Sequence, residues 1–366
     1  MKINKPKIAV IGLKGLPAFG GAAAVGENII EQLKDIYDFT VYAISSHTNK
    51  KGDYNGFKQI VFKSIPFKKL NTLYYYIVSA LHAVVFGNYD LIHLHHRDAA
   101  FIILILKLRY GSILLTTHGI FRLLDKWKYY RWYFTVQEKI FIRFANAITC
   151  VSLNEKRLFK KILNMDAHHI PNGINEVVAL DSGDSKRKDY LFFGAGRIIH
   201  SKGCDVMLKA LNILNYEGKI LIAGDIDQTP EHRNLLIELA LTLHVDFLGL
   251  IKDKNNLLNY IKNAKFFIFP SSIEAMSMML LEAASVKTPI ICSDIIENRD
   301  IFNEEEVLFF RTDDPNDLAK KINWALQNPD IMQLCAEKAY KKLKDKYLWG
   351  KIAKQYSEYY ERLMKV

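Results

Sequence analysis

Two basic residues flank a glycine-containing turn and could bind an anion. Arg197 and Lys202 belong to the segment GAGRIIHSKG (194–203), which follows the short apolar run 191–193. An arginine can clamp a phosphate with two parallel hydrogen bonds, and a lysine adds a compact positive charge. Either residue alone is consistent with a solvated surface cation. Their shared place at the end of an apolar run favours a loop that holds a diphosphate.

Two carboxylates interrupt the apolar segment FFIFPSSIEAMSMMLLEAASVKTPIICS (266–293). Glu282 follows Glu274 by eight residues. If both lie on one helix, their directions differ by roughly 80°, so both can face the same ligand. Without other support, the pair is equally consistent with an N-terminal dipole partner and a solvated helix residue. Its place between two apolar runs favours a functional pair.

The elements around these carboxylates follow from the same segment. Residues 265–269 form an aromatic-rich apolar run closed by Pro270, which predicts a strand that is buried on both faces. Ser271 and Ser272 are predicted helix caps. The helix that follows carries on its apolar side Met276, Met279, Leu280 and Ala283. Pro289 ends this helix, and residues 290–292 begin a second buried strand.

The N-terminal segment has the same strand, glycine loop and helix order. A strand over 7–12 precedes Gly15, Gly20 and Gly21, and a helix is predicted over 22–33. This unit indicates a doubly wound α/β domain. The glycine spacing G-x2-G-x4-G-G differs from the dinucleotide-binding pattern. Small residues let backbone amides approach an anion or a sugar, although a tight turn explains the glycines equally well.

Histidines follow two further predicted strands of this domain. The strand over 90–95 ends in His93, His95 and His96, with Asp98 close behind. This cluster could suggest a metal site, but no further ligand set with suitable spacing is present, so a metal is not expected. His118 and Gly119 follow the strand in 111–117, at the usual ligand-binding edge of such a sheet. A loop histidine without a role is the competing interpretation.

A second α/β cycle begins at Tyr190, after the polar segment 181–189. The 366-residue chain is long enough for two domains, and half of its residues are hydrophobic. We predict an N-terminal domain over 1–180, a second domain over 189–346 and a final helical segment over 347–366. Further elements are predicted over 39–44, 74–86, 147–152, 153–163, 204–215, 219–224, 246–250, 256–263, 315–326, 330–346 and 351–364.

Composition restricts the possible partners and compartment. The formal net charge is +11, but no nucleic-acid-binding motif accompanies it. The segment 121–134 mixes four cations with seven aromatic residues. This mixture suits an anionic membrane surface, although a solvated basic face over an aromatic core is the alternative. Four widely spaced cysteines indicate a reducing compartment. No signal peptide or membrane-spanning run is evident, so a cytoplasmic protein, with possible peripheral attachment to the inner membrane face, is expected.

The order of these motifs resembles retaining glycosyltransferases of family 4, which have the two-domain GT-B architecture with a central cleft. The resemblance rests on the four motifs Gly20-Gly21, His118-Gly119, Arg197-x4-Lys202 and Glu274-x7-Glu282, and it spans nearly the whole chain. It implies a nucleoside diphosphate sugar donor held mainly by the second domain, with no metal and no other cofactor. It also implies a saccharide or lipid-linked saccharide acceptor in cell-surface polysaccharide synthesis, such as that of capsule or lipopolysaccharide.

The resemblance also implies a role for each motif. Arg197 and Lys202 stabilise the leaving diphosphate, and Glu274 and His118 lie near the transferred sugar. Donor-binding residues are then Gly20, Gly21, Glu282 at the ribose, Ser277, Met278 and the main chain near Ile251 at the base. Many relatives have Glu-Gly-Phe-Gly where this chain has Glu274-Ala-Met-Ser. The remaining alternatives are a glycoside hydrolase, a sugar-nucleotide epimerase and a non-catalytic partner that binds a sugar nucleotide.

Overall fold

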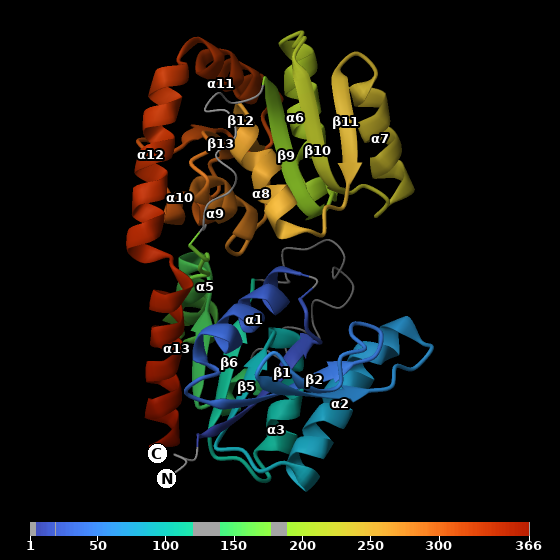
Figure 1. The fold of residues 1–366 in the computed structure, drawn as a ribbon, viewed down its shortest axis with the longest axis vertical. Coiled ribbons are helices and arrows are strands. Elements are labelled where there is room, and N and C mark those ends of the chain that lie inside the picture. The colour runs from blue at the N-terminus through green and yellow to red at the C-terminus, as the bar shows by residue number, and fades with distance from the viewer. Residues whose placement is uncertain (1–4, 19, 120–139, 177–188, 366) are drawn as a thin grey trace. The chain divides into compact units, whose positions relative to one another are not determined.

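The computed structural model describes residues 5–18, 20–119, 140–176 and 189–365 (Figure 1). The chain divides into two compact units: Met1–Gly173 with Trp349–Val366, and Ile174–Leu348. Each unit is a parallel α/β sheet with helical crossovers, which confirms the predicted α/β class with two Rossmann-like domains. The aromatic and basic segment 121–134 lies outside the described residues, as does nearly all of the polar segment 181–189.

The first unit contains an eight-stranded sheet in the order β3-β4-β2-β1-β5-β6-β7-β8. All neighbours are parallel except the antiparallel pair β3–β4. Because the central strands are apolar on both faces, helices must cover both sides. The strands are β1 (Lys7–Lys14), β2 (Asp38–Ile44), β3 (Gly52–Tyr54), β4 (Phe57–Phe62), β5 (Leu91–His95), β6 (Ile113–Thr117), β7 (Ala147–Cys150) and β8 (His168–His169).

The helices of this unit include the last helix of the chain. They are α1 (Gly21–Leu33), α2 (Lys68–Phe86), α3 (Ile103–Leu106), α5 (Leu153–Leu158) and α13 (Trp349–Met364). Helix α13 packs against α1, β5 and β6 and buries Trp349, Tyr356 and Tyr360 (Figure 1). The Tyr360 hydroxyl lies 2.8 Å from Nδ1 of His93, which fixes α13 directly over β5. The C-terminal segment is therefore part of the core of the first unit.

The second unit contains a six-stranded, fully parallel sheet in the order β11-β10-β9-β12-β13-β14. The strands are β9 (Tyr190–Arg197), β10 (Lys219–Asp225), β11 (His244–Gly249), β12 (Phe266–Phe269), β13 (Ile290–Ser293) and β14 (Leu308–Phe310). The helices are α6 (Cys204–Ile213), α7 (Pro230–Ala240), α8 (Lys254–Asn263), α9 (Met278–Ser285), α10 (Ile296–Ile301), α11 (Pro315–Gln327) and α12 (Pro329–Lys346). Apolar residues of β9, β10 and β12 pack with α6 and α11 in one core.

Several element boundaries differ from those predicted. Helix α2 begins at Lys68 rather than at residue 74. The prediction followed the apolar run, and the helix extends beyond the start of that run into a polar first turn. Strand β9 continues to Arg197, which pairs with Asp225 of β10, so Arg197 is a strand residue and not part of a turn. The helix predicted over 153–163 changes at Phe159 into a wider π-helical turn that ends with Asn164 in the left-handed conformation.

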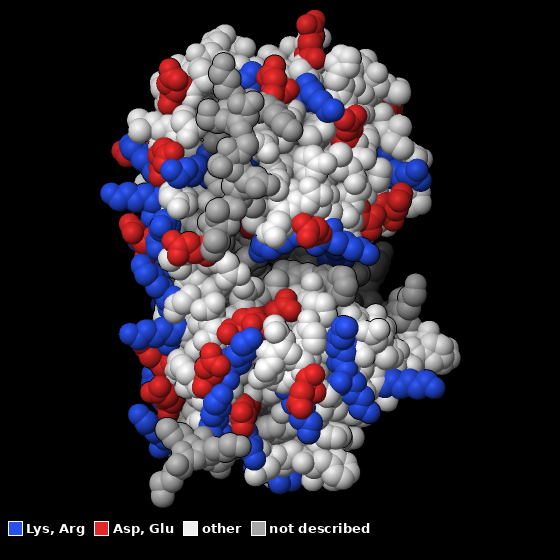
Figure 2. Space-filling model, in the orientation of Figure 1, with Lys and Arg blue, Asp and Glu red and all other residues white. Residues whose placement is uncertain are grey.

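The surface over α12 carries both signs of charge in a mixed pattern (Figure 2). Three lysines of this helix form ion pairs with glutamates elsewhere in the second unit: Lys338 with Glu305, Lys342 with Glu306 and Lys344 with Glu176. The positive net charge is therefore partly compensated on this face. Within the residues that the structure describes, no helix is both long and apolar enough to cross a membrane.

Candidate active site

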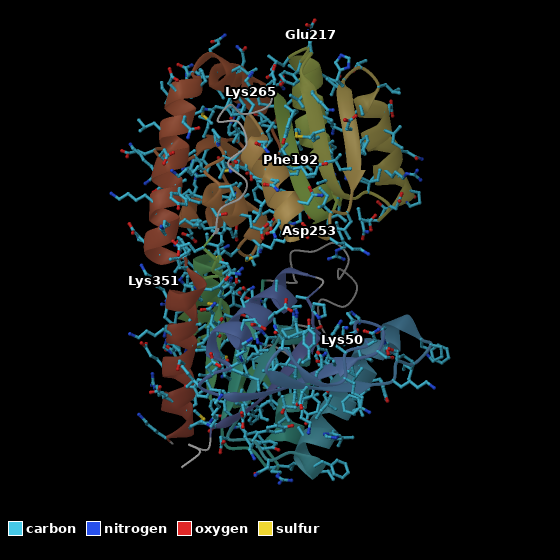
Figure 3. The ribbon with its side chains drawn as sticks, viewed as in Figure 1. Lys50, Phe192, Glu217, Asp253, Lys265 and Lys351 are labelled. Atoms are coloured by element: carbon cyan, nitrogen blue, oxygen red, sulfur yellow. The ribbon has the colours of Figure 1, made fainter. Side chains whose placement is uncertain are left out.

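The charged motifs of the second unit meet at one edge of its sheet. Strands β9 and β12 are parallel neighbours, so the loops that leave their carboxyl ends, 197–203 and 270–277, lie side by side. The amide of Ser272 donates a hydrogen bond of 2.9 Å to the carbonyl oxygen of Ser201. Figure 3 labels Glu217 and Lys265 at the opposite end of the sheet, and Asp253 at the edge where the strands end.

Gly203 allows the closest approach between these two loops. Its φ is +68°, and a Cβ atom at this position would lie 2.2 Å from the carbonyl oxygen of Pro270. Any larger residue would push the loops apart and would strain the backbone. The glycine therefore places Lys202, the preceding residue, directly against the loop that carries Glu274.

Lys202 and Glu274 form an ion pair at this edge. The ammonium nitrogen of Lys202 donates to Oε1 of Glu274 over 2.6 Å, and the side chains are 26% and 10% exposed. Such a partly buried, charge-assisted hydrogen bond restrains both side chains. The sequence indicated both residues, but only the structure shows that they contact each other.

The helical arrangement predicted for Glu274 is wrong. Helix α9 begins at Met278, after the N-cap residue Ser277, so Glu274 and Met276 lie in a loop. Ser271 and Ser272 are accordingly not helix caps. The Ser272 amide donates to the Ser201 carbonyl oxygen and Pro270 lies against Gly203, so the residues before α9 are held against the segment 201–203 in a loop. The angular argument that placed Glu274 and Glu282 on one helix therefore fails, although both remain near the sheet edge.

Glu282 does lie on α9, and its partner comes from another helix. Its carboxylate accepts an ion-pair contact of 3.0 Å from Nζ of Lys254, the first residue of α8. Glu282 is nearly buried, whereas the Lys254 side chain is 52% exposed. Sequence reasoning missed Lys254. Its position shortly after β11, at the carboxyl end of a strand, was the available signal.

The side chain of Arg197 is exposed and makes no hydrogen bond or ion pair with another described residue. Its guanidinium is thus available to an anion from solution. Nearby, Gly194 faces Met279 of α9, because a Cβ atom there would lie 2.4 Å from the Met279 methyl carbon. This contact brings the start of α9 next to the end of β9, so that the amides of the first turn of α9 lie near the basic loop.

The remaining predicted donor-binding residues are also at this edge. Ser277 is buried at the start of α9, and Met278 is half-buried as its first helical residue. The Ser277 side chain makes no capping hydrogen bond, so the first-turn amides are not capped by it. Ile251 is half-buried in the connection between β11 and α8. Whether these residues bind a nucleotide stays a prediction.

The sheet edge of the first unit is lined with histidines. Nδ1 of His95 lies 3.1 Å from Nε2 of His118, and the two rings are stacked. Burial lowers the pKa of both imidazoles well below the usual range, so they are neutral near pH 7. Both nitrogens of His93 are engaged, with Tyr360 and with Thr116, so His93 has no free nitrogen for a metal.

Gly20 and Gly21 lie at the start of α1, in the loop that follows β1. Both are exposed, and a Cβ atom at either position would meet nothing within 4 Å. By contrast, only glycine fits at position 12. The φ of Gly12 is +120°, and a Cβ atom there would lie 2.0 Å from the His95 carbonyl oxygen. Gly12 therefore permits close packing of β1 against β5, whereas the approach of an anion or a sugar to the Gly20–Gly21 loop stays a prediction.

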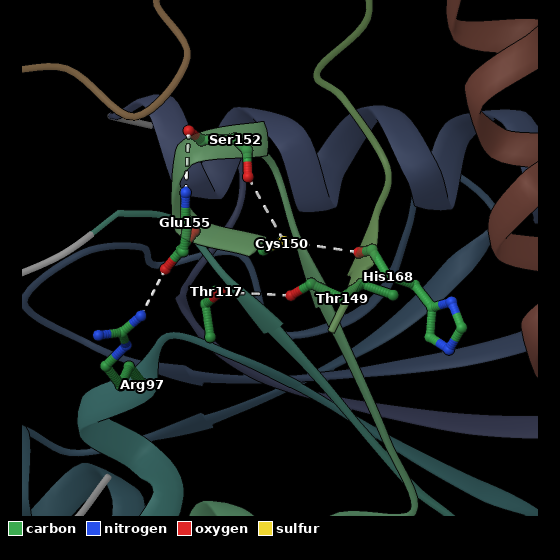
Figure 4. A network of polar contacts seen from close by, with 7 residues as sticks. All are labelled: Arg97, Thr117, Thr149, Cys150, Ser152, Glu155 and His168. Carbon is green, nitrogen blue, oxygen red and sulfur yellow. Dashed lines mark hydrogen bonds and ion pairs between the residues drawn. The ribbon is translucent and has the colours of Figure 1, made fainter. Parts of the chain in front are cut away.

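A buried ion pair supports the His118 segment, and sequence reasoning missed it. Arg97 donates to Glu155 over 2.6 Å, and their side chains are 6% and 1% exposed (Figure 4). Close to this pair, Thr117 donates to the carbonyl oxygen of Thr149. An isolated arginine and glutamate 58 residues apart leave no pattern in one sequence.

Two family models together cover most of the chain. The model of Glycosyltransferase Family 4 matches residues 19–177, and the model of glycosyl transferases group 1 matches residues 180–342. The chain belongs to the GT-B glycosyltransferases. The glycosyltransferase family predicted from the sequence motifs is confirmed, and each of the two units matches one model.

Curated relatives of this glycosyltransferase are distant. A phosphatidyl-myo-inositol mannosyltransferase of Mycobacterium tuberculosis is 27% identical over 305 residues, which cover 75% of this chain and 74% of the relative. N-acetylgalactosamine-N,N'-diacetylbacillosaminyl-diphospho-undecaprenol 4-alpha-N-acetylgalactosaminyltransferase of Campylobacter jejuni is 27% identical over 158 residues, 43% of this chain and 42% of the relative. The chain thus spans less than half the length of several curated relatives that it matches.

The fold is shared with solved glycosyltransferase structures. Sucrose-phosphate synthase from Thermosynechococcus elongatus superposes with a TM-score of 0.84 over 99% of this chain and 100% of that chain. The sequence identity is 22%, so this likeness establishes the fold alone.

Proposed function

We propose that the protein transfers a sugar from a nucleoside diphosphate sugar to a saccharide or lipid-linked saccharide acceptor, with retention of anomeric configuration. The observation that carries this proposal is the convergence of Arg197, Lys202 and Glu274 at one sheet edge, together with the Glu282–Lys254 pair. A leaving diphosphate needs cations, and a sugar needs acceptors for its hydroxyls. Both kinds of group are present within the second unit.

The charges suggest how the donor is held. Arg197, which has no partner among the described residues, binds the diphosphate, and the Lys202 ammonium shares its charge between the diphosphate and Glu274. Negative charge grows on the diphosphate as the glycosidic bond breaks. Fixed cations that face this charge lower the barrier, because they need no reorganisation during the reaction. This role requires no metal ion at the diphosphate.

The two carboxylates act on neutral hydroxyl groups. Glu274, held by Lys202, accepts hydrogen bonds from the transferred sugar, and Glu282 accepts them from the ribose. Lys254 holds the Glu282 carboxylate in place through their 3.0 Å contact. The amides of Ser277 and Met278 lie at the start of α9, where a phosphate is favoured. We propose that His118 and the Gly20–Gly21 loop, which both belong to the first unit, bind the sugar or the acceptor.

The first experiment is a thermal-shift screen of the full chain against UDP, GDP, ADP, dTDP and CMP. A ligand that binds only the folded state raises the melting temperature by mass action. We expect one diphosphate to give a shift, and Arg197→Ala to abolish it. Arg311→Ala is the matched control, because Arg311 is an exposed arginine that pairs with Asp314. No shift with any diphosphate would contradict the proposed donor site.

Product analysis then separates transfer from the other activities. With the sugar nucleotide identified by the screen and an acceptor mixture, the transferase releases nucleoside diphosphate only when acceptor is present. Conversion of the donor without acceptor would indicate an epimerase. Binding without any release would indicate a non-catalytic partner, and cleavage of glycosides that phosphate does not inhibit would indicate a hydrolase.

The acceptor is proposed to lie at a membrane surface. The aromatic and basic segment 121–134 supports this, as do apolar residues that helix α2 leaves exposed, among them Leu81, Val85 and Phe86. Charge reversal at Lys126, Lys128 and Arg131 should weaken binding to vesicles that contain anionic phospholipid. Unchanged vesicle binding would remove the membrane part of the proposal and leave the transfer reaction intact.

A further inference from the structure

Three potential metal ligands converge in the second unit outside the residues discussed so far. His200 begins the short 3-10 turn His200–Lys202, Asp205 lies in the first turn of α6, and His232 lies in the first turn of α7. One nitrogen or oxygen atom from each lies within 4.8 Å of the others. Nδ1 of His200 is 3.6 Å from Oδ1 of Asp205, and the two imidazole rings are 5.8 Å apart.

Two of these side chains are buried, and each has a polar atom that makes no hydrogen bond with another described residue. Asp205 is 0% exposed and His232 is 9% exposed. Within the described residues, neither Oδ1 of Asp205 nor Nε2 of His232 makes a hydrogen bond. Buried polar atoms are nearly always satisfied, so a pair that points at a common space requires an explanation. A bound cation between them would satisfy both atoms.

We infer that His200, Asp205 and His232 bind a divalent first-row transition-metal ion such as Zn²⁺. Two imidazole nitrogens and one carboxylate oxygen favour such ions over Mg²⁺ and Ca²⁺, which prefer oxygen ligands only. Zinc ligands lie about 2.0–2.1 Å from the metal, so the three atoms need to close by only a fraction of their present separation. The His200 side chain is 81% exposed and is free to make this adjustment.

A nearby lysine should limit the affinity of this site for a metal ion. The ammonium group of Lys209 contacts the other carboxylate oxygen of Asp205 over 3.0 Å, which leaves Oδ1 for the metal. A second positive charge close to a dication opposes binding. Because the Lys209 side chain is 42% exposed, it can move into solvent when the metal binds. Lys209→Met should therefore strengthen metal binding.

The proposed metal site is distinct from the proposed donor-binding site, because none of its three ligands is proposed to bind the donor. His200 lies between Arg197 and Lys202 in the chain, whereas His232 belongs to α7. A metal at this point would fasten the loop 197–203 to the neighbouring helix. It would thereby restrain the backbone that carries the two proposed diphosphate-binding cations.

The test is direct metal titration of the full chain, after removal of metal with a chelator. Co²⁺ replaces Zn²⁺ in such sites and reports its coordination by visible absorption. We expect one Co²⁺ to bind with the absorption of a low-coordinate site, and excess Zn²⁺ to displace it. His200→Ala and His232→Ala should each weaken binding at least about tenfold, since loss of even an indirect contact typically weakens a metal site by 10–100-fold.

His244→Ala is the matched control, because His244 is exposed on the same unit and outside the cluster. It should bind Co²⁺ like the original chain. His200→Ala removes an exposed side chain and so keeps the fold, which protects the test against simple unfolding. Equal Co²⁺ binding by His200→Ala, His232→Ala and the original chain would overturn the inference, as would the absence of Co²⁺ binding to the original chain.

Hydrogen exchange provides a second readout that does not depend on activity. Zn²⁺ should slow amide exchange in the segment 197–205 of the original chain, and should leave it unchanged in His232→Ala. Nucleotide binding is measured separately by thermal shift, so failure of the donor site would not affect this result. Unchanged exchange in the original chain at saturating Zn²⁺ would contradict the proposed restraint.

Discussion

Each unit has an ion pair with the same 2.6 Å separation, but in different surroundings. Arg97 and Glu155 in the first unit are 6% and 1% exposed, whereas Lys202 and Glu274 in the second are 26% and 10% exposed. The first pair supports the protein core beneath the His118 segment. The second pair lies at a sheet edge where a ligand can replace one partner. We therefore expect burial, rather than distance, to separate a pair that stabilises the fold from a pair that can bind a ligand.

The two sheet edges also differ in the burial and charge of their side chains. The edge of the first unit has neutral, buried histidines, and burial lowers their pKa values. The edge of the second unit has Arg197, Lys202 and Lys254 with two carboxylates, which are suited to a charged diphosphate. Neutral imidazoles suit the hydroxyls of a sugar or acceptor. The chemistry of the two units is therefore complementary, and each of the following changes tests one side of the comparison.

The largest expected effect is loss of stability when the buried pair is broken. Arg97→Met leaves Glu155 buried without its cation, and such changes cost about 3–5 kcal/mol of unfolding free energy. Urea denaturation of the full chain measures this. Arg299→Met is the matched control, because Arg299 pairs with Glu304 at the same 2.6 Å distance but on the surface. It should cost less than about 1 kcal/mol. Equal losses would contradict the role assigned to burial.

The second prediction concerns the exposed guanidinium of Arg197. Arg197→Ala should lower kcat by about 10²–10³-fold, the usual result of removing one group that stabilises transition-state charge. Stability should hardly change, because the exposed Arg197 side chain makes no hydrogen bond or ion pair with another described residue. Arg197→Lys should restore only part of the rate, since a lysine cannot form two parallel hydrogen bonds to a phosphate. A full rate in Arg197→Ala would remove this residue from the mechanism.

The third prediction compares the Lys202–Glu274 pair with the buried Arg97–Glu155 pair. Lys202→Met and Glu274→Gln should each lower kcat, and the double variant should lose less than the sum of the two, with a coupling of about 0.5–3 kcal/mol. The unfolding free energy of each variant should fall less than that of Arg97→Met. Additive rate effects would show that the two residues act independently, despite the 2.6 Å contact.

Sequence patterns predicted more of the fold than of the contacts within the site. The parallel strands and their crossovers follow from apolar runs bounded by glycine and proline, which are local signals. The start of α9 was placed too early, because the tertiary contacts of Pro270 and Ser272 with the segment 201–203 hold the preceding residues in a loop. The Arg97–Glu155 and Glu282–Lys254 pairs join distant segments. One sequence contains no signal for such pairs, because each residue alone resembles many surface charges.

The fourth prediction uses the neutral histidines of the first unit. Burial lowers the pKa of His93 to about 3, so between this value and about 6.5 the unfolded chain binds more protons than the folded chain. The contribution of neutral His93 to the free energy of unfolding is therefore fully present above about pH 6.5 and is lost as the pH falls. From pH 7 to pH 5, His93 alone should cost the first unit about 2 kcal/mol.

Hydrogen exchange of the slowest amides in β5 and in β9 can follow the two units separately in the full chain. Acidification should destabilise β5 more than β9. His93→Gln keeps a donor and an acceptor for Tyr360 and Thr116 but cannot titrate, so it should reduce the pH dependence in β5. His244→Gln, an exposed control in the second unit, should leave both slopes unchanged. Equal acid sensitivity of β5 in His93→Gln and the original chain would refute the assignment.

The smallest effect is expected at the Glu282–Lys254 pair. Lys254 is 52% exposed, so its contact with Glu282 contributes little to stability, typically below about 1 kcal/mol. Glu282→Gln should weaken binding of the nucleotide by up to about tenfold, because a neutral amide accepts weaker hydrogen bonds from the ribose than a carboxylate does. Lys254→Ala should weaken it less, since the Glu282 carboxylate itself makes the proposed hydrogen bonds to the ribose. Calorimetric titration of both variants measures the order, and a larger loss in Lys254→Ala would mean that Lys254 itself contacts the nucleotide.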